Sequence, residues 1–399
     1  MKIISCHCVL SLLLLLSCSK KPPAIPVDHL FTLLPENYAH LKFENKLVDE
    51  TNFNVFKYRN YYNGGGVAIG DANNDGLPDV YLTSNQQDNK LFLNQGNFRF
   101  RDATKQAGVA GTHNWSTGVC MVDVNGDQRL DIYVCNSGNI KGDDRANELF
   151  INQGNKKNGV PIFKEAAAEY GIDDKGFSTH AAFFDYDRDG DLDLYVLNNA
   201  FRALSTFDLS KNLRHERDFS GGGSRFYRND NGKFVDISEE AGIYGSVIAF
   251  GLGVSASDIN NDGWCDIYVA NDFFERDYLY INNRNGTFSE KLEEMIRHTS
   301  LSSMGADIAD LNNDGFMDIL GSDMLPEDDY RLKTTFTFEP FDFYQKKFEW
   351  DYYHQLSQNV LQLNNGFDSQ NRMTFSEIGL LAGVAATDWS WGALIVDMN

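Results

Sequence analysis

A nine-residue pattern, Asp-x-Asn/Asp-x-Asp-Gly-x-x-Asp, recurs five times in this 399-residue chain and constrains its fold more than any other feature. The copies are DANNDGLPD (71–79), DVNGDQRLD (123–131), DYDRDGDLD (185–193), DINNDGWCD (258–266) and DLNNDGFMD (310–318). A Gly-rich apolar stretch precedes each copy, and a β-rich run such as VYLTS or IYVAN follows it. Repetition at intervals of roughly 50 to 70 residues indicates an array in which each unit is one supersecondary structure.

The residues around each copy alternate between apolar and polar positions, which is typical of strands with one buried face. A second strand pair follows in most units, as in KLFLNQGNFRFRDAT and YLYINNRNGTFSE, with Asn-Gly or Gln-Gly turns. We therefore expect an all-β fold of four-stranded antiparallel meanders, the blades of a β-propeller. The composition, with 34 Gly, 29 Phe and 18 Tyr, favours the same class. A β-solenoid of calcium repeats is the alternative, but its units recur every nine or so residues.

The acidic residues of the pattern predict metal sites. Carboxylates at positions 1, 3 and 5 of one tight turn repel each other unless a cation lies between them. The spacing matches the front of the EF-hand loop, with side-chain oxygens at positions 1, 3 and 5, a backbone carbonyl at 7 and Gly at 6. Here an Asp stands at position 9, and the motif joins two strands. Because every donor is oxygen, Ca²⁺ is favoured over Zn²⁺, and over Mg²⁺ with its stricter octahedral geometry.

We thus expect about five Ca²⁺ sites, each held by the side chains at positions 1, 3, 5 and 9 and by the carbonyl at position 7. The ligands are Asp71, Asn73, Asp75, Leu77, Asp79; Asp123, Asn125, Asp127, Arg129, Asp131; Asp185, Asp187, Asp189, Asp191, Asp193; Asp258, Asn260, Asp262, Trp264, Asp266; and Asp310, Asn312, Asp314, Phe316, Asp318. The second loop departs from the pattern because Gln128 stands at position 6. Asx-capped turns without a metal are the alternative interpretation of any single loop.

The charge balance excludes one class of partner. The chain has 35 Lys and Arg against 57 Asp and Glu, for a formal net charge of −22. Nucleic-acid binding rests on clustered cations that release counterions, and the sequence contains no basic stripe. The acidity instead follows from the metal loops.

The N-terminus resembles a bacterial export signal. The apolar run 9–16 is far shorter than the roughly 20 residues of a transmembrane helix. Residues 15–19, at the end of this run, read Leu-Leu-Ser-Cys-Ser, which resembles a lipobox. We expect a signal peptide over 1–17, lipidation at Cys18, a tether over 18–27, a strand-forming segment over 28–63 and the propeller over 64–399. This organisation predicts a lipoprotein of the cell envelope, at the outer membrane, whose only membrane contact is the lipid.

The repeats and their flanking strands resemble FG-GAP or VCBS repeats, the calcium-bearing blades also found in integrin α subunits. The likeness extends to VCBS-repeat lipoproteins of Bacteroidetes-type bacteria in the cartilage-acidic-protein-like ASPIC/UnbV family. It is carried by YYNGGGVAIGDANNDGLPDVYLTSN, NELFINQG, FFDYDRDGDLDLYVLN, SMGADIADLNNDGFMDIL and ATDWSWGALIVDMN. The resemblance implies a propeller with about seven blades and a binding role at the cell envelope.

The last residues, Asp397 to Asn399, match the first three positions of a further calcium loop, and WSWGALIV before them matches an inner strand. We therefore expect an incomplete propeller, with five blades and the start of a sixth, in an N-terminal fragment of a longer protein. Two segments interrupt the repeats, 200–223 and 325–355, and are expected to form binding loops on one propeller face.

The sequence favours a binding or adhesion protein that recognises a polysaccharide or an envelope or extracellular protein. It contains no Gly-x-Ser-x-Gly, His-Glu-x-x-His or Walker motif. A calcium-dependent polysaccharide lyase, or an accessory subunit of a glycan-utilisation system, is the alternative. In a lyase, the candidate catalytic groups would be His180, and His215 with Arg214 and Arg217.

Two further expectations concern packing. Trp389 and Trp391 alternate on one expected strand and so would share a face in the core; with Phe273 and Phe274 they could instead form a protein interface. Cys120, Cys135 and Cys265 show no disulfide framework, and reflection about the second loop places Cys120 opposite Val134 rather than Cys135. They are interpreted as small apolar thiols.

Overall fold

The structure is a computed structural model that describes residues 31–112, 115–138, 145–200, 210–217, 219, 223–337 and 339–398. The expected signal peptide, the tether and Cys18 lie outside these residues. The chain divides into two units, residues 1–40 and 41–399. In the first unit the described residues contain one short helix, α1 (Glu36–Ala39). No helix in the described ranges is long and apolar enough to cross a membrane.

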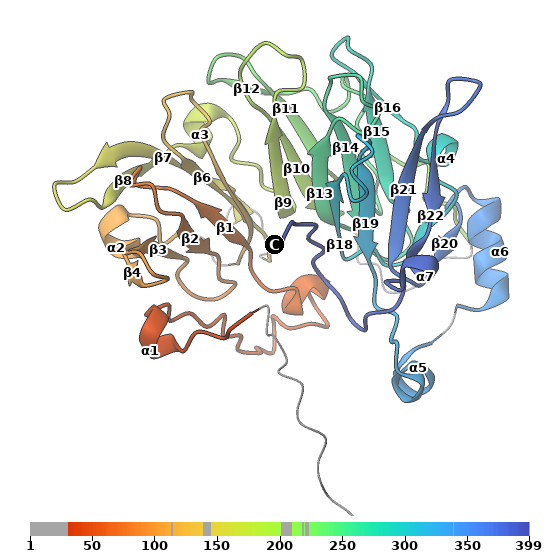
Figure 1. Cartoon of the computed structure of the whole chain (residues 1–399), viewed down its shortest axis with the longest axis horizontal. Helices are drawn as coiled ribbons and strands as arrows, with labels where there is room; N and C mark the ends of the chain where they lie inside the picture. The colour runs from red at the N-terminus through yellow and green to blue at the C-terminus, as the bar shows by residue number, and fades with distance from the viewer. Residues whose placement is uncertain are drawn as a thin grey trace, which may run out of the picture. The chain divides into compact units, whose positions relative to one another are not determined.

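The second unit confirms the expected all-β class: its described residues form five four-stranded antiparallel sheets, with the strand arrangement of propeller blades (Figure 1). In each sheet the strands follow one another along the chain. The strands are β1 (Val67–Gly70), β2 (Asp79–Leu82), β3 (Lys90–Asn94) and β4 (Phe100–Asp102); β5 (Ser116–Val122), β6 (Asp131–Asn136), β7 (Glu148–Asn155) and β8 (Pro161–Glu165); β9 (Phe177–Phe184), β10 (Asp193–Asn199), β11 (Arg225–Asn229) and β12 (Phe234–Asp236); β13 (Gly251–Ser257), β14 (Asp266–Asn271), β15 (Tyr278–Asn282) and β16 (Phe288–Glu290); and β18 (Gly305–Ala309), β19 (Asp318–Ser322), β21 (Val360–Phe367) and β22 (Met373–Glu377).

Each nine-residue pattern connects the first two strands of its sheet, as expected. The last Asp of the pattern is the first residue of the second strand; for example, Gly70 pairs with Asp79 across the β1–β2 hairpin. The five loops therefore occupy equivalent positions in the five sheets. One register differs from expectation: Cys120 pairs with Tyr133 rather than Val134, because Val122 pairs with Asp131 and the hairpin is centred between residues 126 and 127.

The first strands of successive sheets contact one another, β1 with β5, β5 with β9, β9 with β13 and β13 with β18. Glycines permit this approach. A Cβ atom on Gly118 would lie 2.5 Å from the carbonyl oxygen of Thr179 and 2.9 Å from the Cα of His180, and one on Gly253 would lie 3.0 Å from the Cα of Gly305. The Gly-rich stretches before the loops thus allow close packing of neighbouring backbones.

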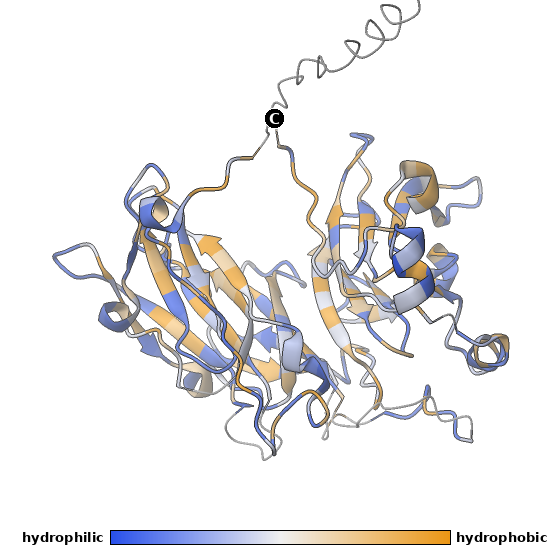
Figure 2. Cartoon of the chain, turned by 90° about the horizontal axis from the view of Figure 1, so that it is seen from below, coloured by the Kyte–Doolittle hydropathy of each residue, from blue (hydrophilic) through white to orange (hydrophobic). Residues whose placement is uncertain are grey.

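The core lies between neighbouring sheets. In one cluster, Tyr81 and Leu91 of the first sheet pack against Ile132 and Phe150 of the second, and three equivalent clusters join the later pairs of sheets. Bands of apolar residues alternate with polar ones along the strands (Figure 2). Cys135 is fully buried here, and all three described cysteines are free thiols. Burial of alternate strand residues on both faces holds each sheet against its neighbours.

Short helices and one parallel strand pair complete the fold. The one-turn helices α2 (Thr104–Ala107), α3 (Ala167–Tyr170) and α7 (Gly379–Ala382) each end at a glycine with φ between 75° and 84°, the left-handed conformation common after a helix C-terminus. The remaining elements are η1 (Arg59–Tyr62), α2 (Thr104–Ala107), α3 (Ala167–Tyr170), α4 (Leu292–Met295), α5 (Asp329–Thr335), α6 (Phe341–Glu349), α7 (Gly379–Ala382), β17 (Thr299–Ser300) and β20 (Gln355–Leu356). The interruption at 325–355 thus contains α5, α6 and β20, between the second and third strands of the fifth sheet.

The strand expected within residues 28–63 is not formed by the described residues 31–63. They contain α1, η1 and a single isolated bridge between Glu50 and Phe53. The aromatic side chains of this segment pack around Trp115 instead, with Phe53 edge-on at 4.9 Å and Tyr61 at 5.0 Å between ring centroids. Side-chain packing, rather than a hydrogen-bond ladder, holds this segment.

The expected strand with Trp389 and Trp391 on one buried face is also wrong. Residues 390–398 have no strand assignment, and the two side chains are 56% and 42% exposed. The backbone nevertheless runs beside the fifth sheet: Ser322 Oγ donates to the Trp391 carbonyl at 3.1 Å, and the Ile395 amide donates to Asp307 Oδ2 at 2.6 Å. In the described part of the chain this segment has no ladder partner, so its side chains stay outside a core.

Candidate metal centres

The side chains of each loop turn inward and accept hydrogen bonds from their own loop. In the first loop, Asp71 accepts from the amides of Asp75 at 3.0 Å and Gly76 at 2.7 Å, and Asp75 accepts from Leu77 at 3.0 Å. Asp79 accepts from the Ala72 amide at 3.0 Å. The second, fourth and fifth loops repeat these bonds at equivalent positions. The structure therefore brings the expected side-chain ligands at positions 1, 5 and 9 into one turn.

Two left-handed residues make the turn, at positions 4 and 6. Asn74 and Gly76 have φ of 54° and 87° in the first loop. The second loop reverses the residue types: Gly126 stands at position 4, and Gln128 adopts φ 66° at position 6. The Gln128 amide still donates to Asp123 Oδ2 at 2.7 Å, so the loop keeps its geometry. Left-handed backbone at a non-glycine residue costs roughly 1 kcal/mol, and this loop bears that cost.

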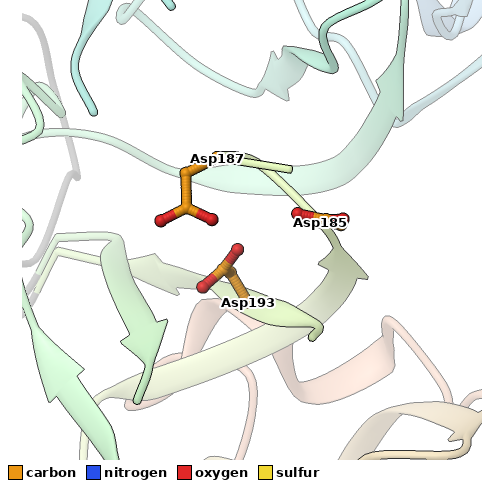
Figure 3. Close-up of side chains that lie close together, drawn as sticks. All are labelled: Asp185, Asp187 and Asp193. Atoms are coloured by element: carbon orange, nitrogen blue, oxygen red, sulfur yellow. The ribbon is translucent and has the colours of Figure 1, made fainter. Parts of the chain in front are cut away.

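The third loop gathers the most negative charge. The carboxylates of Asp185, Asp187 and Asp193 each offer an oxygen within 4.8 Å of the others, and they face one common space (Figure 3). Buried oxygens of Asp185, Asp187 and Asp191 have no hydrogen-bond partner among the described residues. In the first loop, by contrast, Asn73 stands at position 3 and donates its Nδ2 to Asp75 at 2.9 Å. Unpartnered buried carboxylate oxygens are costly, so a hard cation fits this loop.

The Asp at position 9 is the most buried ligand, and burial raises its pKa. Burial raises the pKa of Asp79 and Asp131 to about 6, and that of Asp193 and Asp266 to about 7. Asp193 Oδ1 accepts a hydrogen bond at 2.9 Å from the amide of Asn229, which lies at the end of the third strand of the sheet. Position 9 is therefore held by its own loop and by the middle of the sheet.

These raised pKa values predict how calcium should act with pH. The folded-state pKa of Asp193 lies above the ordinary aspartate value of 3.8, so the calcium-free fold binds protons more tightly than the unfolded chain. The stability that the calcium-free fold gains from this tighter proton binding is fully present below about pH 4. It is lost as the pH rises through about 6 to 7. Because Ca²⁺ must displace these protons, its apparent affinity should fall by about tenfold or more between about pH 8 and pH 5.5.

The measurement is the melting temperature of metal-depleted protein with and without Ca²⁺ at both pH values. Depletion on a chelating resin avoids soluble chelators, whose own affinity changes with pH. Calcium should raise the melting temperature more at the higher pH. An equal increase at both pH values would contradict the burial of these carboxylates.

An Asn that closes the third strand joins neighbouring sheets, and the sequence analysis missed it. Asn282 donates its Nδ2 to the Tyr186 carbonyl at 2.8 Å and to the Cys265 carbonyl at 3.3 Å. Tyr186 is position 2 of the third loop, whereas Cys265 is position 8 of the fourth. In the same way, Asn152 bridges the loops of the first and second sheets. Asn364 bridges the loops of the fourth and fifth sheets. The signal was present in the recurrent Asn of FLNQG, FINQG, FYRND and YINNR.

Replacement of Asn282 by Ala is expected to lower the free energy of unfolding in excess calcium by about 2 kcal/mol, because two buried carbonyls lose their donor. The neighbouring exposed Asn283 donates to Thr287 at 3.0 Å within its own turn and provides the matched control. Asn283→Ala should change the free energy by less than about 0.5 kcal/mol. Urea denaturation measures both variants, and equal losses would show that the bridge is unimportant.

Two of the candidate catalytic residues of the lyase alternative, Arg214 and Arg217, pack over the same ring, that of Tyr244. Arg214 is buried and pairs with Glu275 at 3.1 Å. His215 is exposed and contacts Asp351 at 3.0 Å, whereas Arg217 packs over the ring of Tyr244. His180 lies in β9, where burial lowers its pKa.

The family model described as an FG-GAP-like repeat matches residues 52–134 and 258–321 of this chain. Mouse cartilage acidic protein 1 is 30% identical over 156 residues, which cover 39% of this chain and 23% of that protein. Mouse integrin alpha-3 is 36% identical over 81 residues, 18% of this chain and 8% of the integrin. These findings support the resemblance drawn from the repeats, and the matched segment spans less than a quarter of either relative.

A solved structure of an Agrocybe aegerita lectin that recognises non-reducing terminal N-acetylglucosamine aligns with 78% of this chain and 64% of its own. The sequence identity is 16% and the TM-score is 0.39, so this likeness supports no conclusion about function.

Proposed function

We propose that this protein is a calcium-stabilised binding or adhesion module of the cell envelope, anchored by a lipid at Cys18, which recognises a polysaccharide or protein partner and does not act as an enzyme. One observation carries the calcium assignment: four loops share one inward-facing hydrogen-bond geometry, and the third leaves buried carboxylate oxygens without partners among the described residues. Bound Ca²⁺ would supply positive charge between these carboxylates and hold each hairpin in register.

The binding role is supported by the two segments that interrupt the repeats. Residues from both of them meet: Asn212 donates to the Trp350 carbonyl at 3.4 Å, and His215 contacts Asp351. Leu213 and Trp350 also pack around the same buried side chains, Ile248, Phe250 and Tyr352. Rigidly supported loops outside a repeated scaffold are common sites of recognition. Similarity to an integrin α subunit supports an adhesion-type role.

Isothermal titration of metal-depleted protein with Ca²⁺ tests the metal assignment. About five ions should bind, and Asp187→Ala should remove about one, because it deletes one carboxylate of the third-loop cluster. Asp230→Ala is the matched control, since Asp230 is exposed and pairs with Arg228 at 2.7 Å. Absence of binding at millimolar Ca²⁺, or equal stoichiometry in both variants, would exclude the proposed sites.

The lipid anchor is tested separately. Mass spectrometry of the N-terminal peptide from protein expressed in a Gram-negative host should show cleavage before Cys18 and the added acyl mass. Cys18→Ala should release the protein from the membrane fraction. An unmodified Cys18 in membrane-associated protein would contradict the anchor.

A further inference from the structure

A cavity of about 550 Å³ lies outside the metal loops, beside the interruption at 325–355. It is lined by Glu293, Arg297, Phe348, Asp351, Tyr353 and His354. Four of these residues come from the end of α6 and the segment after it, and the other two belong to α4 and the residues that follow α4. Its volume falls within the range of small-molecule sites in proteins.

The charged groups of the cavity are partly engaged by the protein. Glu293 contacts Arg276 at 3.3 Å and Asp351 contacts His215 at 3.0 Å, each through one carboxylate oxygen. Each therefore keeps a second oxygen that can accept a hydrogen bond. Arg297 has no ion pair among the described residues, so its guanidinium can donate to a ligand. The lining of the cavity therefore offers a ligand both hydrogen-bond acceptors and hydrogen-bond donors.

An aromatic wall stands beside these groups. Phe348 is 49% exposed, and its ring stacks on His354 with centroids 4.5 Å apart and planes at 25°. The His354 ring is fixed in turn, because its Nδ1 and the Tyr344 hydroxyl are 2.8 Å apart. The Phe348–His354 pair is therefore held in place by contacts within the protein, without a ligand.

The backbone of the cavity is held in an unusual conformation. Asp351 and Tyr353 have φ of 64° and 68°, which non-glycine residues rarely adopt. Tyr352 between them is 2% exposed, and its amide donates to the Lys347 carbonyl at 3.0 Å. The Tyr353 hydroxyl donates to the Ile296 carbonyl at 2.8 Å. Strain maintained by surrounding contacts is characteristic of ligand-binding segments.

We infer that this cavity binds one pyranose ring of a neutral polysaccharide. Polarised C–H groups on one face of the ring would meet the negative face of Phe348, and its hydroxyls would bond to Glu293, Asp351 and Arg297. Two carboxylates in the lining, in a chain of net charge −22, oppose an acidic glycan. The confined volume suits a single ring better than an extended peptide. This inference rests on the polysaccharide arm of the proposed function.

The test titrates the full chain, in excess Ca²⁺, with cellotetraose, maltotetraose and laminaritetraose, using calorimetry and saturation-transfer NMR. At least one should bind with a dissociation constant of about 0.1 to 1 mM. Phe348→Ala and Arg297→Gln should each weaken that binding about fivefold or more. Phe341→Ala, at an exposed aromatic of the same helix outside the cavity, and Arg372→Gln, at an exposed arginine bonded to Asp368, are the matched controls.

Each outcome is decisive. No binding of any neutral tetrasaccharide, or unchanged binding in both cavity variants, overturns the inference; tighter binding of tetragalacturonate overturns the neutral-ring assignment. The thermal melt of the same samples with and without Ca²⁺ reports on the metal sites independently. If calcium stabilises the protein but no glycan binds, the cavity inference and the polysaccharide arm of the proposed function fail, while the metal assignment stands. If the variants weaken glycan binding while calcium has no effect on melting, the metal part of the proposed function fails instead.

Discussion

Removal of calcium is expected to lower the melting temperature of this protein by about 10 °C or more. An ion that binds only the folded state adds RT ln(1 + [Ca²⁺]/Kd) per site. Extracellular calcium modules have dissociation constants of about 10⁻⁴ to 10⁻³ M, so about 5 mM Ca²⁺ contributes roughly 1 to 2 kcal/mol per site. Five independent sites therefore contribute about 5 to 10 kcal/mol, and each kcal/mol corresponds to about 2 °C in a chain of this size.

Calorimetry at about pH 8 with Ca²⁺ or with EDTA measures this effect. Mg²⁺ at the same concentration is the control for ionic strength and should restore only part of the loss, because it binds carboxylate loops with stricter geometry. The Asp187→Ala variant should lose about one fifth of the calcium-dependent increase. A melting temperature that EDTA leaves unchanged would contradict the assignment of all five loops.

The second large effect is expected at Arg214, whose replacement by Ala should lower the free energy of unfolding by about 3 to 5 kcal/mol. The Arg214 and Glu275 side chains are 4% and 0% exposed and lie 3.1 Å apart. Burial raises the pKa of Glu275, and the charge of Arg214 opposes that rise. Without Arg214, Glu275 must either remain charged in the interior or take up a proton, and both cost free energy.

Urea denaturation of Arg214→Ala, Glu275→Gln and the double variant provides the double-mutant cycle. The double variant should recover part of the loss, because no unpaired buried charge remains. Arg228→Ala, which breaks an exposed pair with Asp230, should cost less than about 1 kcal/mol. Additive single-variant effects would show that Arg214 and Glu275 are not coupled.

The metal loops and hairpins could be predicted because their determinants are close together in the chain. Within nine residues the pattern specifies a turn, its left-handed positions and the carboxylates that face inward, and alternation beside it specifies the two strands. Reflection about the second loop predicted the strand register to within one residue. Cys120 pairs with Tyr133 instead of the expected Val134.

Predictions of strands that needed a pairing strand far away in the sequence were less accurate. The described residues 31–63 form no strand, and aromatic rings of this segment pack around Trp115 instead. Residues 390–398 carry a strand-like pattern, but among the described residues they find no ladder partner, so Trp389 and Trp391 are exposed. An alternating pattern predicts which face a strand would bury only once a neighbouring strand is present.

The sequence by itself determined the repeated unit, the acidic loops and the all-β class, because each rests on side chains within a few residues of one another. Only the tertiary structure decided which loops are bridged by Asn152, Asn282 and Asn364, and that residues of two distant interruptions meet beside one cavity. Asn282 contacts Tyr186, and His215 contacts Asp351, across long stretches of chain. Local periodicity carries no information about such contacts, because they form only after the sheets have packed against each other.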